Sequence, residues 1–240
     1  MAGNKHKIIV LIPTYNEREN IEELVNKILS LPVDCDLTVF VVDDDSPDGT
    51  AGAVERLAEK DPRVLLLLRK KRRGRGAAGI EGFTTALSLG ADYVIEMDGD
   101  GSHEPRFIPF LLEAAGSADV VLGSRFVKGG RDADRPLHRR IITRLVRLFL
   151  RRQFHLPVRD VTSGFRCFRR EVLQKIDLED LISVGPSVVL ETLYKAHLLG
   201  FSMVEVPIVF VDRKKGKTKL TVLTLLETLI MALKFKKIYR

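Results

Sequence analysis

The sequence predicts an α/β fold in which a mostly parallel sheet is flanked by helices. Short apolar runs alternate along the chain with segments in which apolar residues recur at helical spacing. The connections between them are short and rich in Gly, Pro and Asp, as at residues 43–50 and 98–102. Strands joined through helices form right-handed crossovers, and such units build a sheet of mainly parallel strands.

The first strand is expected at residues 7–12, where an apolar run stops before Pro13. Its helix follows the loop at residues 14–20 and places these side chains on one face: Ile21, Leu24, Val25, Ile28 and Leu29. Further strands are expected at residues 37–42, 64–68, 93–97, 119–122 and 203–211. Pro207 removes a ladder donor and breaks the last of these strands, so we expect that strand at or near an edge. Residues 160–166 are expected to form a compact polar turn.

Asp98 and Asp100 follow the strand at residues 93–97 directly. Ligands of open α/β sheets bind outside the carboxyl ends of the strands, so both carboxylates are expected at the mouth of the sheet. Hard oxygen ligands there suit Mg²⁺ or Mn²⁺ bound to phosphates. An Asp-x-Asp alone is common in solvated turns, and the prediction depends on the residues around it.

A second acidic group, Asp43 to Asp45, ends the strand at residues 37–42, and Glu17 follows the first strand. Carboxylates gathered at one edge need a cation or hydrogen-bond donors. For Asp45 and Asp48 a turn that caps the next helix is an equally good interpretation.

Composition restricts the class of protein. The 240 residues are 45% hydrophobic and 30% charged, which is typical of globular proteins. The net charge of +7 indicates an anionic partner. Cys35 and Cys167 have no disulfide or zinc spacing and are interpreted as free thiols. No apolar run reaches the length of a spanning helix, and the polar start indicates no signal peptide.

Basic segments leave two interpretations open. The loop at residues 69–76 is rich in arginine, and its glycine spacing at residues 74–79 follows the third strand, so we discount it as a dinucleotide site. Such a charge run could bind nucleic acid, although it lacks interleaved aromatic residues. In the helix expected at residues 136–152, an arginine stripe beside an apolar side fits an anionic membrane surface or a solvated face.

The ordered set of motifs resembles the family 2 glycosyltransferases, and within them the dolichol-phosphate (polyprenol-phosphate) mannose synthases. The matching segments are residues 13–20, 42–50, 97–100, 123–125, 162–166 and 205–220. The resemblance implies a GT-A (Rossmann-like) catalytic domain at residues 1–219. Residues 220–240 are then an amphipathic or apolar tail that docks on a membrane or a partner.

The resemblance also implies the reaction and its substrates. The reaction is inverting transfer of mannose from GDP-mannose to dolichyl or another polyprenyl phosphate. The cofactor is Mg²⁺ or Mn²⁺, and no nucleic-acid partner is expected. The expected partners are a membrane surface and small membrane-spanning subunits. The expected location is the cytoplasmic face of a membrane, the plasma membrane of a prokaryote or the endoplasmic reticulum of a eukaryote. Glucose transfer from UDP-glucose by the same machinery is the alternative.

Site residues follow from the matching positions. The metal is assigned to Asp98 and Asp100, and catalysis to Asp100, Arg125 and Arg213. The acceptor phosphate is assigned to Arg125, Arg139 and Thr143. The donor nucleotide is assigned to Pro13, Tyr15, Glu17, Val42, Asp44, Asp98, Gly99, Asp100, Ser102, Arg213 and Lys219.

Two departures from the family pattern stand out. Gly99 and Gly101 flank Asp100 where the family usually has Asp-Ala-Asp and then a larger residue. The loop at residues 69–76 carries more arginine than the family's usual Lys-Gly-Leu-Gly. Glu191 lies inside an apolar helix face and is expected either to be paired in the core or to line the site.

Overall fold

A computed structural model describes residues 5–71, 73–133, 137–212 and 222–239. Its strands are β1 (Lys7–Thr14), β2 (Asp36–Asp43), β3 (Val64–Leu68), β4 (Tyr93–Glu96), β5 (Val120–Ser124), β6 (Arg131–Ala133), β7 (Arg166–Arg169), β8 (Met203–Pro207) and β9 (Val209–Val211). Its α-helices are α1 (Arg18–Leu29), α2 (Thr50–Ala58), α3 (Arg75–Ser88), α4 (Ile108–Ala115), α5 (Leu137–Phe154), α6 (Arg170–Lys175), α7 (Val188–Leu198) and α8 (Val222–Ile238).

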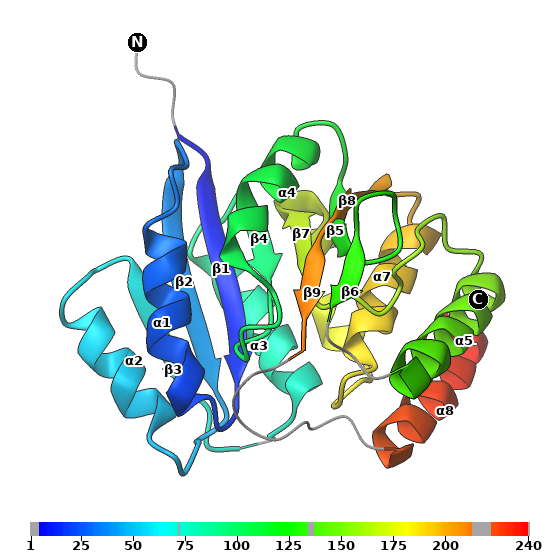
Figure 1. Cartoon of the computed structure of the whole chain (residues 1–240), viewed down its shortest axis with the longest axis horizontal. Coiled ribbons are helices and arrows are strands. Elements are labelled where there is room, and N and C mark those ends of the chain that lie inside the picture. The colour runs from blue at the N-terminus through cyan, green and yellow to red at the C-terminus, as the bar shows by residue number, and fades with distance from the viewer. Residues whose placement is uncertain (1–4, 72, 134–136, 213–221, 240) are drawn as a thin grey trace.

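A seven-stranded sheet in the order β3-β2-β1-β4-β7-β5-β8 forms the centre of the molecule (Figure 1). β1, β2, β3 and β4 are parallel, β5 and β8 are parallel, and only β7 runs antiparallel to its neighbours among the described strands of this sheet. A small parallel sheet pairs β6 with β9. The predicted α/β fold with a mostly parallel sheet is therefore confirmed.

Helices cover both faces of the sheet, because β1 and β2 are apolar on both sides. Alternate residues of β1 divide between two buried clusters, with Ile8, Val10 and Ile12 in one and Ile9 and Leu11 in the other. The first cluster packs against α1, α2 and α4. The second packs against α3, α5, α6, α7 and α8.

Two local predictions were confirmed in outline but not in full. Residues 160–165 form the expected turn, with the Ser163 N–H donating to the Asp160 carbonyl, but β7, which begins at Arg166 and lies between β4 and β5, was not predicted. The strand expected at residues 203–211 breaks after Pro207 into β8 and β9, and the buried N–H of Ile208 between them donates to the Ser124 carbonyl. β8 does form an edge of the main sheet, as Pro207 at its last position predicted.

A buried ion pair explains how a strand as polar as β7 occupies the middle of the sheet. Arg166 faces Glu96 across the β4–β7 register, both side chains are fully buried, and Arg166 Nη2 donates to Glu96 Oε2. Arg166 Nη1 also donates to the Val189 carbonyl at 2.7 Å and to Thr192 Oγ1 at 2.6 Å. Hydrogen bonds to the charged partners replace the water that both groups lose on folding.

α5 and α8 lie toward the same end of the molecule in Figure 1 and contribute to the same core cluster. Leu150 and Phe154 of α5 and Ala232 and Phe235 of α8 are buried. The rest of the apolar side of α5 faces solvent, with these exposed side chains: Leu137, Ile141, Ile142, Leu145, Leu148 and Phe149. Within the part of the chain that the structure describes, no helix is both long enough and apolar enough to span a bilayer.

The Glu96–Arg166 pair predicts a specific pH dependence of stability. Burial alone would raise the pKa of Glu96, but Arg166 and then Arg75 outweigh it and lower that pKa from 4.5 to about 2. A carboxylate with a depressed folded-state pKa stabilises the fold above its unfolded pKa and loses this contribution as the pH falls toward its folded value. Glu96→Gln should therefore reduce the free energy of unfolding at pH 7 by about 3 kcal/mol.

The difference between the two proteins should shrink as the pH falls from about 4.5 toward 2. Urea unfolding measured across this range tests it. A gap that stays constant would show that the Glu96 charge is not stabilised in the fold.

Candidate active site

The loop after β4 holds Asp98 and Asp100 at the carboxyl end of the sheet. Asp100 Oδ1 accepts hydrogen bonds from the Ser102 N–H at 3.0 Å and from Ser102 Oγ at 2.5 Å. Gly101 has a φ of 76°, a conformation that glycine adopts without strain. A Cβ on Gly99 would lie 3.0 Å from Thr14 Cγ2, so the loop packs tightly on the end of β1. Gly99 and Gly101, which depart from the family pattern, thus fit a compact loop.

The buried side chain of His103 holds the backbone of this loop by a hydrogen bond. The sequence alone indicated no role for this residue. The Asp98 N–H donates to His103 Nδ1 at 3.1 Å. The ring is 2% exposed, stacks on Phe165 at 5.1 Å and meets Phe210 edge-on at 5.6 Å. Burial lowers the pKa of His103. A neutral imidazole that accepts at Nδ1 carries its proton on Nε2, so His103 is a fixed acceptor for the loop backbone.

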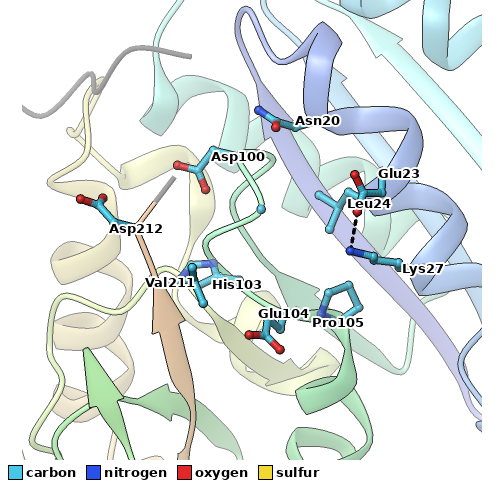
Figure 2. Close-up of a pocket in the computed structure, with 11 residues that line it drawn as sticks. Asn20, Glu23, Leu24, Lys27, Asp100, His103, Glu104, Pro105, Val211 and Asp212 are labelled. Atoms are coloured by element: carbon cyan, nitrogen blue, oxygen red, sulfur yellow. Dashed lines mark hydrogen bonds and ion pairs between the residues drawn. The ribbon is translucent and has the colours of Figure 1, made fainter. Parts of the chain in front are cut away.

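The oxygens here suit a divalent cation. The Asp98 side chain is 37% exposed, and Asp100 borders a groove of about 230 Å³ between α1, the loop after β4 and the end of β9 (Figure 2). Asp212 lines the same groove and lies opposite Asp100 in Figure 2. Among the described residues, no cluster of three or more His, Cys, Asp or Glu side chains could hold a metal unaided. Divalent ions of this type take six or more oxygen ligands, so two aspartates leave room for oxygens of substrate or water.

The end of β2 is held by a second set of hydrogen bonds. Asp43 is fully buried and accepts from Thr14 Oγ1 at 2.8 Å and from Ser46, through its N–H at 2.8 Å and its Oγ at 2.7 Å. Asp44 is 5% exposed and accepts from Arg69 Nη1 and, at 2.7 Å, from the Gly74 N–H. The basic loop therefore closes over the acidic strand end.

Two further aspartates of this loop have structural contacts. Asp48 Oδ1 accepts from the N–H of Thr50 at 3.0 Å, and Thr50 is the first residue of α2. Asp45 pairs with Arg73. The turn-and-cap interpretation describes the contacts of Asp48, and Asp45 serves to hold the basic loop.

The residues assigned to the nucleotide at the first two strands differ in how they could reach a ligand. Tyr15, which follows the carboxyl end of β1, is 37% exposed. Glu17 is 4% exposed, accepts from Asn20 Nδ2 at 2.9 Å and donates its N–H to Thr50 Oγ1 at 3.0 Å. Pro13 pairs with Val42 in register, and the Val42 side chain is buried in the core, so Val42 could present only its backbone.

Arg125 follows β5 and is chelated by a buried carboxylate. Its Nε donates to Asp160 Oδ2 at 2.8 Å and its Nη2 to Asp160 Oδ1 at 2.7 Å, and Nη2 also reaches Thr162 Oγ1 at 3.0 Å. Burial alone would lower the pKa of Arg125, but Asp160 above all, with Asp132 and Asp98, raises it. The guanidinium is therefore a rigid cation whose environment includes the charge of Asp98.

α5 carries two of the residues assigned to the acceptor, Arg139 and Thr143, and reaches the Phe126 ring beside Arg125. Arg147 of α5 packs its guanidinium 4.3 Å from the centre of the Phe126 ring, and Arg125 lies 5.3 Å from the same ring. Thr143, one turn earlier on α5, is partly buried. The Arg139 side chain, Arg213 and Lys219 lie outside what the structure describes, so their assigned roles remain predictions.

Glu191 and the glycine-rich start of α3 both make contacts within the protein. Glu191 is fully buried and accepts from the N–H groups of Ile182 and Ser183, both at 2.9 Å, and from the Tyr239 hydroxyl at 2.6 Å. At the start of α3, the N–H groups of Gly76 and Ala77 donate to the Val184 carbonyl at 2.8 Å and 3.3 Å. The glycine-rich start of α3 thus packs on the loop before α7, in agreement with discounting it as a dinucleotide site.

Comparison with known proteins places this geometry in a family. Residues 9–177 match the family model described as glycosyl transferase family 2. The undecaprenyl-phosphate mannosyltransferase of Micrococcus luteus is 39% identical over 215 residues, which cover 90% of this chain and 88% of that protein. The polyprenol monophosphomannose synthase of Mycolicibacterium smegmatis is 39% identical over 218 residues, covering 90% of this chain and 81% of that protein.

Among solved structures, glucosyl-3-phosphoglycerate synthase from Mycobacterium tuberculosis, in complex with Mn²⁺, UDP-glucose and phosphoglyceric acid, shares the fold. The TM-score is 0.69 at 19% sequence identity, and the match covers 97% of this chain and 80% of that one. The family model matches most of the chain, and the mostly parallel sheet has acidic residues at the carboxyl ends of its strands. The chain belongs to glycosyl transferase family 2.

Proposed function

We propose that this glycosyltransferase transfers mannose from GDP-mannose to a polyprenyl phosphate. The observation that carries the proposal is the meeting of opposite charges at one edge of the sheet, with Asp98 and Asp100 after β4 and Arg125 after β5. Carboxylates suit a metal on the donor diphosphate, whereas a chelated arginine suits an acceptor phosphate. The names of the two bacterial relatives support both the sugar and the lipid acceptor.

On this proposal the donor lies over the ends of β1, β2 and β4. Tyr15 would cover the nucleotide. Glu17 and Asp44 would contact it through the small exposed part of each side chain. Asp98 and Asp100 would hold Mg²⁺ or Mn²⁺, which supplies charge stabilisation to the leaving diphosphate. A phosphate acceptor is already anionic at neutral pH, so in-line attack with inversion needs no strong general base. The task of the chain's own residues is to position the substrates.

Two rival functions are less well supported. UDP-glucose as donor has the example of the glucosyl-3-phosphoglycerate synthase, but that likeness extends to the fold alone. Nucleic-acid binding was suggested by the basic loop. Three of its arginines are paired with carboxylates of the protein itself: Arg69 with Asp44 and Glu81, Arg73 with Asp45, and Arg75 with Glu96 and Asp98.

Transfer of radiolabelled mannose from GDP-mannose to a short polyprenyl phosphate, with Mg²⁺ or Mn²⁺ and with EDTA, tests the proposal. We expect metal-dependent label in the lipid and a loss of roughly 100-fold in Asp100→Asn, which keeps the side-chain shape but loses the charge. Label from UDP-glucose and none from GDP-mannose would eliminate the mannose proposal.

Arg125 should act on the acceptor rather than on the donor. Arg125→Lys keeps the charge but loses the two-pronged contact with Asp160, so we expect the KM for polyprenyl phosphate to rise about tenfold. The KM for GDP-mannose should stay within about twofold, because the donor contacts lie over other strands. Steady-state kinetics with each substrate varied in turn gives both constants. A rise confined to the donor KM would assign Arg125 to the nucleotide.

We also propose that the exposed apolar face of α5 lies on an anionic membrane. Six large apolar side chains of this helix face solvent, and Arg144 and Arg152 are exposed on the same helix. Apolar area beside cations is the pattern of helices that lie in the headgroup region. The face continues to the acceptor cation, because Arg147 of α5 and Arg125 pack on the same Phe126 ring. A lipid-borne phosphate would then arrive at Arg125 from the membrane side.

Vesicle binding tests this surface. The double variant Leu145→Glu with Leu148→Glu should lower the fraction bound to anionic vesicles about tenfold or more, because both side chains lose burial in the lipid. Phe110→Glu is the matched control, since Phe110 is 53% exposed on α4, which covers the other face of the sheet. Transfer to a short, water-soluble acceptor should persist in both variants. Equal vesicle binding by the double variant and the parent protein would contradict the proposal.

A further inference from the structure

Arg75 joins the buried ion pair of the core to the predicted metal ligand. It is the first residue of α3, and its side chain is 22% exposed. Its Nη1 donates to Glu96 Oε1 at 2.6 Å and its Nη2 to Asp98 Oδ1 at 3.2 Å, while the other oxygen of Glu96 is held by Arg166. Arg75 therefore lies between a fully buried carboxylate and a partly exposed one.

The space around this contact is narrow. A Cβ on Gly164 would lie 3.3 Å from both Arg75 Nη2 and Asp98 Oδ1. The backbone of the loop before β7 thus forms a wall beside the guanidinium and restricts its movement. Asp98 Oδ2 lies 3.8 Å from His103 Nδ1 and 3.4 Å from the same position of a Cβ on Gly164. Arg75 thus holds one oxygen of Asp98, Oδ1.

The charges of this group cancel. Arg75 and Arg166 contribute two positive charges, and Glu96 and Asp98 contribute two negative charges. A carboxylate that already has a cationic partner attracts a metal ion less strongly than an isolated one. A nucleoside diphosphate would add negative charge and oxygen ligands at the same place.

We propose that Arg75 is a positioning residue that holds Asp98 in a compensated state, so that the metal binds with the donor diphosphate and only weakly before it. This inference rests on the proposed function. It is consistent with the composition of the site, in which no group of three or more ligating side chains could hold a metal among the described residues. Arg75→Leu removes the charge and keeps a good helix-forming residue at the first position of α3.

Titration with Mn²⁺, followed by electron paramagnetic resonance with and without GDP, tests the inference. The parent protein should bind Mn²⁺ weakly alone and at least about tenfold more tightly with GDP, after correction for Mn²⁺ held by GDP in solution. Arg75→Leu should bind Mn²⁺ alone roughly tenfold more tightly than the parent, because Asp98 loses its counter-charge. The enhancement by GDP should shrink accordingly.

Three control variants separate charge from structure. Arg75→Lys keeps the charge and should retain weak Mn²⁺ binding, while its lost two-carboxylate contact lowers kcat. The double variant Arg75→Leu/Glu96→Gln removes one positive and one negative charge. Arg166 and Asp98 remain and the group is again neutral, so this variant should also bind Mn²⁺ weakly. Arg63→Leu removes an exposed arginine that pairs with Asp61 and should change nothing.

Suppose that Arg75→Leu binds Mn²⁺ no more tightly than the parent, while the parent still binds Mn²⁺ more tightly with GDP. This result would overturn the proposed role of Arg75 and leave the proposed function standing. If the parent protein binds no Mn²⁺ even with GDP, the metal in the proposed function fails as well. Thermal unfolding of each variant establishes that the titrations compare folded proteins. If Arg75→Leu does not fold, a tight Mn²⁺ site in the folded double variant would overturn the inference.

Discussion

The fully buried pair of Glu96 and Arg166 is the interaction on which the site depends. It allows β7 to enter the sheet between β4 and β5, and that insertion brings Gly164 against Asp98 and Asp160 against Arg125. Because both charges lost their water on folding, each needs the other in place. The same glutamate also holds Arg75, so one buried carboxylate connects the core of the sheet to the predicted metal ligand.

The fold brings the two charge types together by different means. The acidic residues come from the ends of β2 and β4, as in any parallel sheet whose strands end at a common edge. Arg125, the cation proposed for the acceptor, follows β5 and is held by Asp160, on the segment that leads into β7. Parallel strands alone would give an acidic edge. The antiparallel strand, with the loop before it, adds the rigid arginine beside that edge.

Much of this could be predicted from the sequence, and the exceptions have physical reasons. The apolar runs that form β1 to β5 and the helical spacing in α1 determine buried elements directly, and both aspartates could be placed by the strand before them. β7 could not be predicted, because Arg166 is buried only through a partner about 70 residues away in sequence. His103 and Arg75 have no local pattern either, since their roles arise from contacts with Phe165, Phe210, Glu96 and Asp98.

Two groups of arginines among the described residues have different physical roles. Arg69, Arg75, Arg125 and Arg166 compensate carboxylates inside or at the edge of the fold. Such arginines contribute to the net charge of +7, yet their fields are largely cancelled by partners within a few ångströms. The arginines exposed on α5 have an apolar face beside them instead. On the membrane proposal, the exposed arginines of α5 are the ones that would meet an anionic partner, whereas Arg69, Arg73 and Arg75 of the basic loop hold carboxylates of the protein itself.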